Sequence, residues 1–171
     1  MSVANALLVD AFGRVKEAVH GAVEGLGQKQ LTHRVDPDAN TIAWLVWHLT
    51  RIQDDHIAGL AGTEQVWHRE DWVGRFGLPF GRHAHGYGMS SEDVAAVDVP
   101  EDLLLGYHDA VHARTVEYVD GLGDDDYDEV IDRSWDPPVT RAVRLVSVVE
   151  DDMQHVGQAA FVRGVVERLG E

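Results

Sequence analysis

The sequence contains no cysteine among its 171 residues. This absence excludes disulfide bonds, and it also excludes a protein thiolate as a nucleophile or as a zinc ligand. If the protein takes part in thiol chemistry, the thiol must therefore come from a second molecule.

Basic residues and long apolar runs are also scarce. Lys and Arg number 14 against 30 Asp and Glu, which gives a formal net charge of −16. Because nucleic acids and anionic membranes bind to basic surfaces, we expect neither as a partner. No apolar stretch approaches the roughly 18 residues of a membrane-spanning helix, and the N-terminus lacks the pattern of a signal peptide. We therefore expect a soluble, cytoplasmic protein whose partners are small molecules.

The amino-acid composition is typical of one globular domain. Apolar residues make up 44% of the chain and charged residues 26%, and a chain of this length can bury a core. We predict a single domain over residues 1–171. Apolar residues recur three and four apart, as in amphipathic helices, over 3–26, 41–60, 100–122 and 140–169. The pattern predicts an all-α four-helix bundle with up-down connectivity and a long connection between the second and third helices.

The connection over residues 61–100 is too long and too aromatic for a plain linker. Its large apolar side chains include Trp67, Trp72, Phe76, Phe80 and Tyr87. We predict that it folds over the bundle, with short helices at 71–76 and 91–97. Ser90 or Ser91 is the expected N-cap of the second of these helices.

The last predicted helix carries polar residues at a spacing that suits metal binding. Asp151 and His155 are four residues apart, so their Cβ atoms lie about 5–6 Å apart on one face of a helix. A carboxylate and an imidazole in this arrangement can bind one divalent metal ion. The same spacing also suits an ordinary ion pair on a solvated face.

Two polar residues, His48 and Asp55, interrupt the apolar face of the second predicted helix. A single histidine on such a face is more often a hydrogen-bonded core residue than a metal ligand. A second buried polar group without a partner would cost about 1–3 kcal/mol, so the two together indicate a shared site. In a bundle, metal sites are built from side chains on facing helices. His48, Asp151 and His155 therefore form a candidate metal triad.

Other histidines provide rival sites. His108 and His112 are four residues apart on the third predicted helix. His112 falls outside the apolar face of that helix, so both rings do not readily point into the bundle. His83 and His85 lie in a Gly-rich segment, where exposed histidines usually bind nothing.

Two blocks of sequence resemble the DinB-like family, and the resemblance covers nearly the whole chain. The blocks are TIAWLVWHLTRIQDD at residues 41–55 and DDMQHVGQAAFVRG at residues 151–164. The resemblance implies that His48 binds a metal with two residues four apart on the last helix, commonly two histidines. Asp151 occupies the first of these positions, as a carboxylate does in the related mycothiol-dependent maleylpyruvate isomerases. Those isomerases carry catalytic residues in an additional C-terminal domain, so their reaction is not expected here.

The resemblance further implies a divalent metal, zinc or nickel, and transfer of mycothiol, bacillithiol or a similar thiol to an electrophile. A metal ion lowers the pKa of a bound thiol and so supplies a thiolate at neutral pH. In this hypothesis Asp55 is a catalytic residue that orients an imidazole or acts as a further ligand or base. The alternative is a non-enzymatic helical bundle of the stress-protein type that binds a metal or another ligand. Either function is compatible with a homodimer, which we expect.

The choice between Asp151 and its neighbour Asp152 rests on two opposed observations. Helix spacing allows either residue to share a metal with His155, and Asp152 lies closer to the apolar face. The family motif and the full-turn spacing favour Asp151. We therefore predict Asp151 as the ligand, with Asp152 bonded to a neighbouring helix or to the ring nitrogen of a ligand.

Overall fold

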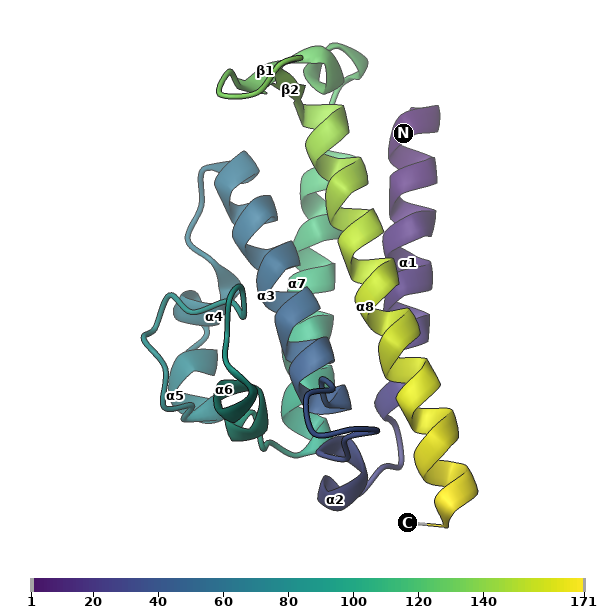
Figure 1. The fold of residues 1–171 in the computed structure, drawn as a ribbon. Coiled ribbons are helices and arrows are strands. Elements are labelled where there is room, and N and C mark those ends of the chain that lie inside the picture. The colour runs from purple at the N-terminus through teal and green to yellow at the C-terminus, as the bar shows by residue number, and fades with distance from the viewer. Residues whose placement is uncertain (1, 171) are drawn as a thin grey trace.

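The computed structural model describes residues 2–170 and is dominated by four long helices (Figure 1). They are α1 (Val3–Val23), α3 (Ile42–Ala61), α7 (Glu101–Asp120) and α8 (Arg141–Leu169). Helices α1 and α3 each pack against both α7 and α8. The prediction of an all-α fold is confirmed. Within residues 2–170, no helix is both long enough and apolar enough to cross a membrane.

Hydroxyl side chains mark the beginnings of three of these helices. Ser2, Thr41 and Thr140 each accept a hydrogen bond from the backbone N–H three residues further on, at 3.3, 3.0 and 3.3 Å. Such caps satisfy N–H groups that have no partner inside the helix. Residues in the left-handed conformation end α3 at Gly62 and α8 at Gly170, with φ of 65° and 71°. The predicted ends of the long helices were therefore correct to within a few residues.

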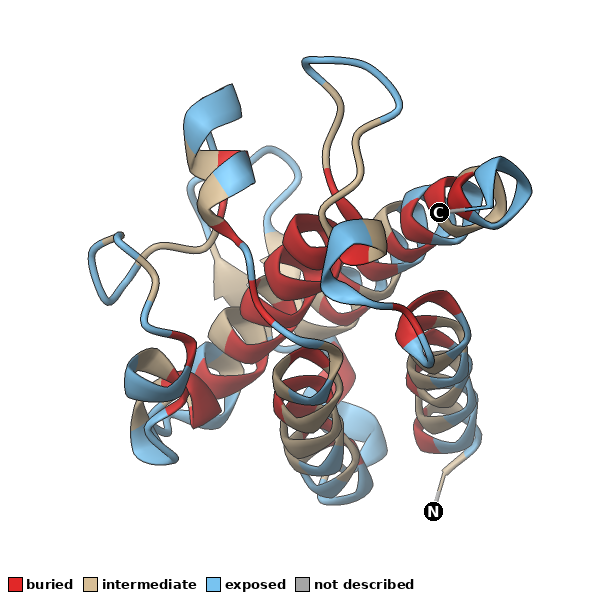
Figure 2. Ribbon diagram, turned by 90° about the horizontal axis from the view of Figure 1, so that it is seen from below, coloured by how far each residue is buried: buried red, intermediate tan, exposed pale blue. Residues whose placement is uncertain are grey.

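The core lies between the facing sides of the long helices, where Figure 2 shows the buried residues. Helix α3 is buried on more than one side, because the bundle covers its inner face and the following connection covers part of its outer face. Its fully buried side chains include the apolar Leu45, Trp47 and Leu49. The charged Arg51 is also fully buried. This double coverage explains why polar groups of α3 need partners inside the protein.

The connection between α3 and α7 folds against these two helices, as the sequence predicted. It contains α4 (Val66–Arg69), α5 (Trp72–Phe76) and α6 (Ser91–Ala96). Three of its aromatic rings surround Tyr107 of α7, with ring centroids 5.1 Å (Trp67), 5.6 Å (Trp72) and 5.8 Å (Phe76) from that of Tyr107. Ser90 caps α6. The short helices α2 (Gln28–Leu31) and α4 were not predicted.

The length of this connection decides the direction of α7. Thr50 of α3 is hydrogen-bonded to His108 of α7, and Gln53 of α3 is hydrogen-bonded to Thr115 of α7. Residue numbers therefore increase in the same direction along both helices, which means that α3 and α7 are parallel. The connection returns the chain to the end of the bundle where α3 begins (Figure 1). Strict up-down alternation therefore does not hold at this step, because a long connection can cross the length of the bundle where a short turn cannot.

A buried carboxylate fixes the connection to α3. Asp54 accepts hydrogen bonds from the backbone N–H groups of Val66 and Trp67, at 2.9 and 2.8 Å, and from the hydroxyl of Tyr107 at 2.8 Å. Burial raises the pKa of the Asp54 carboxyl, while these hydrogen bonds and the nearby Arg51 oppose that shift. The start of α4 is thus held against the middle of α3.

Arg51 extends the same network towards a second part of the connection. Its side chain is 1% exposed, and one of its nitrogens lies 3.7 Å from Asp54. Its guanidinium donates to the side-chain oxygen of Gln65 at 2.9 Å and to the backbone carbonyl of Ala84 at 3.1 Å. Buried charges persist in proteins when they are paired and hydrogen-bonded in this way. No pattern in the sequence indicated this network, which holds Ala84 beside α3.

A small hairpin joins α7 to α8. After a short 3₁₀ helix at Asp124–Asp128, strand β1 (Val130–Asp132) pairs antiparallel with β2 (Val139–Thr140), with Val130 opposite Thr140. This strand pair was not predicted from the sequence. Arg141 donates to the carbonyls of Asp126 and Leu60, at 3.1 and 3.4 Å, which ties the hairpin to the end of α3.

Candidate metal site

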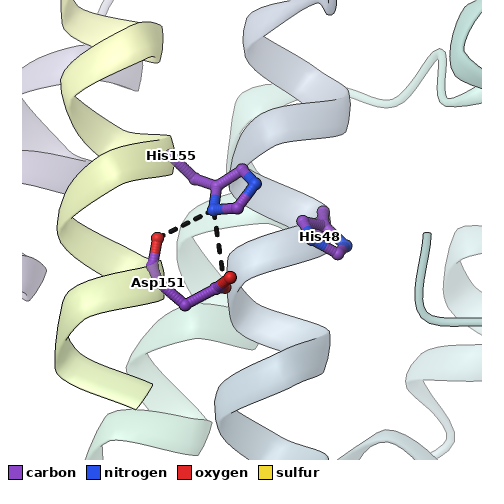
Figure 3. A group of neighbouring side chains, drawn as sticks. All are labelled: His48, Asp151 and His155. Atoms are coloured by element: carbon purple, nitrogen blue, oxygen red, sulfur yellow. Dashed lines mark hydrogen bonds and ion pairs between the residues drawn. The ribbon is translucent and has the colours of Figure 1, made fainter. Parts of the chain in front are cut away.

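Helices α3 and α8 bring His48, Asp151 and His155 together (Figure 3). One potential ligand atom of each side chain lies within 4.8 Å of the others, and His48 is buried while the other two are half-buried. Within residues 2–170 no other three His, Cys, Asp or Glu side chains are grouped closely enough to hold a metal. These are the three residues predicted as ligands from the sequence.

Backbone carbonyls fix the orientation of both imidazole rings. Nδ1 of His48 lies 2.5 Å from the carbonyl oxygen of His85, and Nδ1 of His155 lies 2.7 Å from that of Asp151. Since a carbonyl oxygen can only accept, each Nδ1 carries the proton and donates. Nε2 of each neutral ring is then unprotonated and available to a metal.

The carboxylate of Asp151 completes the set of donor atoms. Its Oδ2 is buried and makes no hydrogen bond with residues 2–170, and it lies 3.4 Å from Nδ1 of His155. Burial alone would raise the pKa of Asp151, but the His155 ring reverses this effect, and the pKa is lowered overall. The carboxylate is therefore ionised at neutral pH.

The pKa values of the two histidines are shifted in opposite directions. The Asp151 carboxylate raises the pKa of His155, whereas burial lowers that of His48.

Two imidazoles and one carboxylate fit a divalent metal such as zinc or nickel. Ligand atoms bound to one zinc ion at about 2.0–2.2 Å lie no more than about 4 Å apart. The separation of up to 4.8 Å therefore requires the side chains to close by roughly 1 Å on metal binding. Rotation of the half-buried Asp151 side chain, whose Oδ2 makes no hydrogen bond with residues 2–170, can supply a movement of this size.

His48 is enclosed by an aromatic ring and a glycine. The indole of Trp44 stacks on its ring, with centroids 4.7 Å apart and planes 12° apart. Gly86 has φ of 102°, and a Cβ at this position would lie 2.4 Å from Nδ1 of His48. The loop can bring the His85 carbonyl to His48 because residue 86 has no side chain.

We expect Gly86→Ala to weaken metal binding by about 10–100-fold, the effect of losing a partner that orients a ligand. The added methyl group would push the loop away from His48 and break the bond to the His85 carbonyl. Gly88→Ala is the matched control, since Gly88 also has a positive φ, of 71°, but no atom lies within 4 Å of its added Cβ. Metal titration of both variants measures the effect, and equal losses would show that backbone strain rather than the contact with His48 is responsible.

Asp55 lies away from the triad. It is half-buried, and its Oδ1 accepts a hydrogen bond of 2.6 Å from Gln65. It is two helical turns from His48, about 10 Å along the axis of α3, and the ring of His48 is oriented by the His85 carbonyl instead. A catalytic role for Asp55 stays a prediction.

Asp152 points into the core. Its side chain is fully buried, and neither carboxyl oxygen makes a hydrogen bond with residues 2–170, so the expected bond to a neighbouring helix is absent there. Burial, together with the charge of Asp151, raises its pKa well above the usual range. The geometry thus favours Asp151 over Asp152 as the ligand.

The rival histidines have other surroundings. His108 is fully buried, its Nδ1 lies 3.1 Å from the hydroxyl of Thr50, and burial lowers its pKa to about 3. The ring of His83 packs on His68, with centroids 5.1 Å apart. His85 contributes its backbone carbonyl to the site, a role that its side chain did not signal in the sequence.

Comparison with known proteins agrees with this architecture. The family model described as mycothiol-S-transferase matches residues 7–168. The crystal structure of a conserved protein from Enterococcus faecalis is similar with a TM-score of 0.91 and 30% sequence identity, over 100% of this chain and 99% of that one. No curated protein sequence matches the chain. From the fold and the family match together, this chain belongs to the DinB-like mycothiol-S-transferase family.

Proposed function

We propose that the protein is a divalent-metal-dependent thiol S-transferase, which joins a low-molecular-weight thiol of the mycothiol type to an electrophilic small molecule. The observation that carries this proposal is the convergence of His48, His155 and Asp151, whose ligand atoms lie within 4.8 Å of one another. Family membership supports the thiol as the nucleophile. The absence of cysteine agrees with a nucleophile that comes from outside the protein.

Each residue of the site has a distinct role in this proposal. A zinc or nickel ion held here would lower the pKa of a thiol and favour the thiolate at neutral pH. His48, Asp151 and His155 provide three ligands, which leaves room in the coordination shell for a substrate. The carbonyls of His85 and Asp151 each hold Nδ1 of an imidazole, which leaves Nε2 of that ring free to bind a metal. Trp44 and the loop at Gly86 cover the ring of His48 and exclude water from it.

The first test measures metal content and thiol consumption on the same preparation. We expect about one zinc or nickel ion per chain, and consumption of mycothiol with an electrophile faster than the uncatalysed reaction. A chelator should remove both properties and lower the melting temperature, because a ligand at 100 times its Kd stabilises a fold by about 2.7 kcal/mol.

The outcomes of this test distinguish a thiol S-transferase from a non-enzymatic metal-binding bundle. Stoichiometric metal without thiol transfer, over a range of thiols and electrophiles, would support the non-enzymatic binding protein. A chain that binds neither zinc nor nickel would contradict the proposed triad. Light scattering on the same preparation tests the expected homodimer.

A further inference from the structure

Two surface pockets lie along α3 and α8, one on each side of the candidate triad of His48, Asp151 and His155. The first, here the apolar groove, has a volume of about 500 Å³. Its lining includes Val35, Leu45, Gly157, Gln158, Phe161 and Val162. The second, here the polar pocket, has a volume of about 620 Å³. Its lining includes Asp55, His56, Gly59, Glu129, Arg141 and Arg144.

The apolar groove begins within one helical turn of the triad. Leu45 precedes His48 by three residues on α3, and Gln158 follows His155 by three residues on α8. One turn corresponds to about 5 Å along a helix. Phe161, six residues or about 9 Å along α8 from His155, is 63% exposed, so apolar surface of the groove faces solvent. A hydrocarbon group placed there would remove this surface from water.

The polar pocket lies on the opposite side of the triad and further from it. Asp55 follows His48 by seven residues, and Arg144 precedes Asp151 by seven. Because α3 and α8 are antiparallel, both residues lie two turns away in the same direction, about 10 Å. Arg144 contacts Nδ1 of His56 at 3.2 Å and the Asp132 carboxylate at 3.5 Å. The pocket thus offers both donors and acceptors of hydrogen bonds.

We propose that these hollows are two separate substrate subsites. The polar pocket binds the polar body of the thiol, and the apolar groove binds the hydrocarbon part of the electrophile, so that sulfur and electrophilic carbon meet at the triad. This inference rests on the proposed thiol transfer and assigns its substrate class: electrophiles that carry an alkyl or aryl chain.

The positions of the hollows favour this assignment over the reverse one. A thiol of the mycothiol type has a hydroxyl-rich sugar body that is joined to its sulfur by a short flexible arm, which suits a pocket about two helical turns away. In the apolar groove the side-chain partners would be the neutral amides of Asn40, Gln154 and Gln158, with no charged group among the lining residues. Most of the hydroxyl groups would then lie against apolar side chains such as Leu45, Val162 and Phe161, where hydroxyls without partners are unfavourable.

An α,β-unsaturated aldehyde fits this arrangement and requires no further reactant. The thiol sulfur adds to the β-carbon, so an S–C bond forms and the π bond between the α- and β-carbons breaks. The proton of the thiol ends on the α-carbon. Hexenal, octenal and decenal present the same reacting atoms with increasing hydrocarbon length.

The chain offers matched positions for blocking each subsite. Gly157 lines the apolar groove and Gly59 lines the polar pocket. Both are exposed helical residues, and no atom lies within 4 Å of a Cβ added to either. Leucine at these positions should fill the hollow without disturbing the core, and it is the better helix former. Gly21 on α1 is equally open and lines neither hollow, so Gly21→Leu is the control.

The test compares KM values for mycothiol and for the three aldehydes. In the wild type we expect kcat/KM to rise with chain length, by at most about 4-fold per buried methylene group. Gly157→Leu should abolish this rise and increase KM for decenal by roughly tenfold, with KM for mycothiol changed less than about twofold. Gly59→Leu should do the reverse, and Gly21→Leu should change neither.

Binding shifts distinguish failure of the subsites from failure of the reaction. Decanol should shift the NMR amide signal of Gly157, and mycothiol that of Gly59. An inactive wild type that shows both shifts would contradict thiol transfer to these aldehydes but support the subsites. The inference is overturned if the shifts are missing or exchanged, or if both variants raise both KM values. It is also overturned if Gly157→Leu alters the oligomeric state but not the KM for decenal, since the groove would then be a contact between two copies.

Discussion

The double variant His48→Ala, His155→Ala is expected to lose stoichiometric metal binding. It removes two of the three side chains whose ligand atoms converge within 4.8 Å, and leaves only the Asp151 carboxylate. Loss of a group that merely orients a ligand costs about 10–100-fold in affinity, so loss of two ligands should exceed the upper end of that range. Elemental analysis and zinc titration measure this. A double variant that retains full metal content would contradict the assignment of the site.

The pair Asp151→Asn and Asp152→Asn tests the register of the last helix. Asp151→Asn keeps the shape but removes the charge of a ligand, and it should weaken metal binding more than tenfold, which is above about 1.4 kcal/mol. Asp152→Asn should weaken it less, because this fully buried side chain points into the core. If Asp152→Asn loses the metal while Asp151→Asn keeps it, the register is wrong by one residue.

Asp152→Asn also has an expected effect on the stability of the metal-free protein. The folded-state pKa of Asp152 is raised well above the value in an unfolded chain. Above about pH 4 the folded state therefore holds a proton that the unfolded state releases, so this residue makes stability fall as pH rises. Asparagine does not titrate, so the Asp152→Asn variant does not lose this contribution as pH rises. The free energy of unfolding of the variant, relative to that of the wild type, should therefore increase from pH 4 to pH 7. Urea unfolding at several pH values measures the difference, and a constant difference would contradict the expectation.

Asp54→Ala should reduce the free energy of unfolding by about 3–5 kcal/mol, the effect of breaking a buried ion pair by removing one partner. The variant leaves the Arg51 guanidinium without its carboxylate. It also leaves two backbone N–H groups and the Tyr107 hydroxyl without their acceptor. We further expect weaker metal binding, because Arg51 holds the carbonyl of Ala84, next to the His85 that orients His48.

The adjacent residue supplies the matched control. Asp55 is half-buried and accepts a hydrogen bond from Gln65, so Asp55→Ala should cost only about 1 kcal/mol. Urea denaturation compares the two variants, and similar losses would contradict the importance of the buried network. Asp55→Asn tests the predicted catalytic role, which requires slower thiol transfer with an unchanged metal content.

Local patterns in the sequence determined most of the helices and the three candidate ligands. Apolar residues three and four apart mark the buried face of a helix, and hydroxyl residues mark where it begins. His48 was recognisable because it interrupts such a face, and Asp151 and His155 because their spacing stacks them on one side of a helix. The motif around these residues also indicated the family.

Only the tertiary structure decided what surrounds these ligands. The His85 carbonyl that orients His48 is a backbone group, and no residue type signals its role. Arg51 and Asp54 look like an ordinary surface pair along one helix until the connection covers them. The parallel course of α7 and the two hollows beside the triad likewise depend on segments far apart in the chain. Helical periodicity is a property of neighbouring residues and can be read from the sequence, whereas these contacts arise when distant segments pack, and they leave no local pattern.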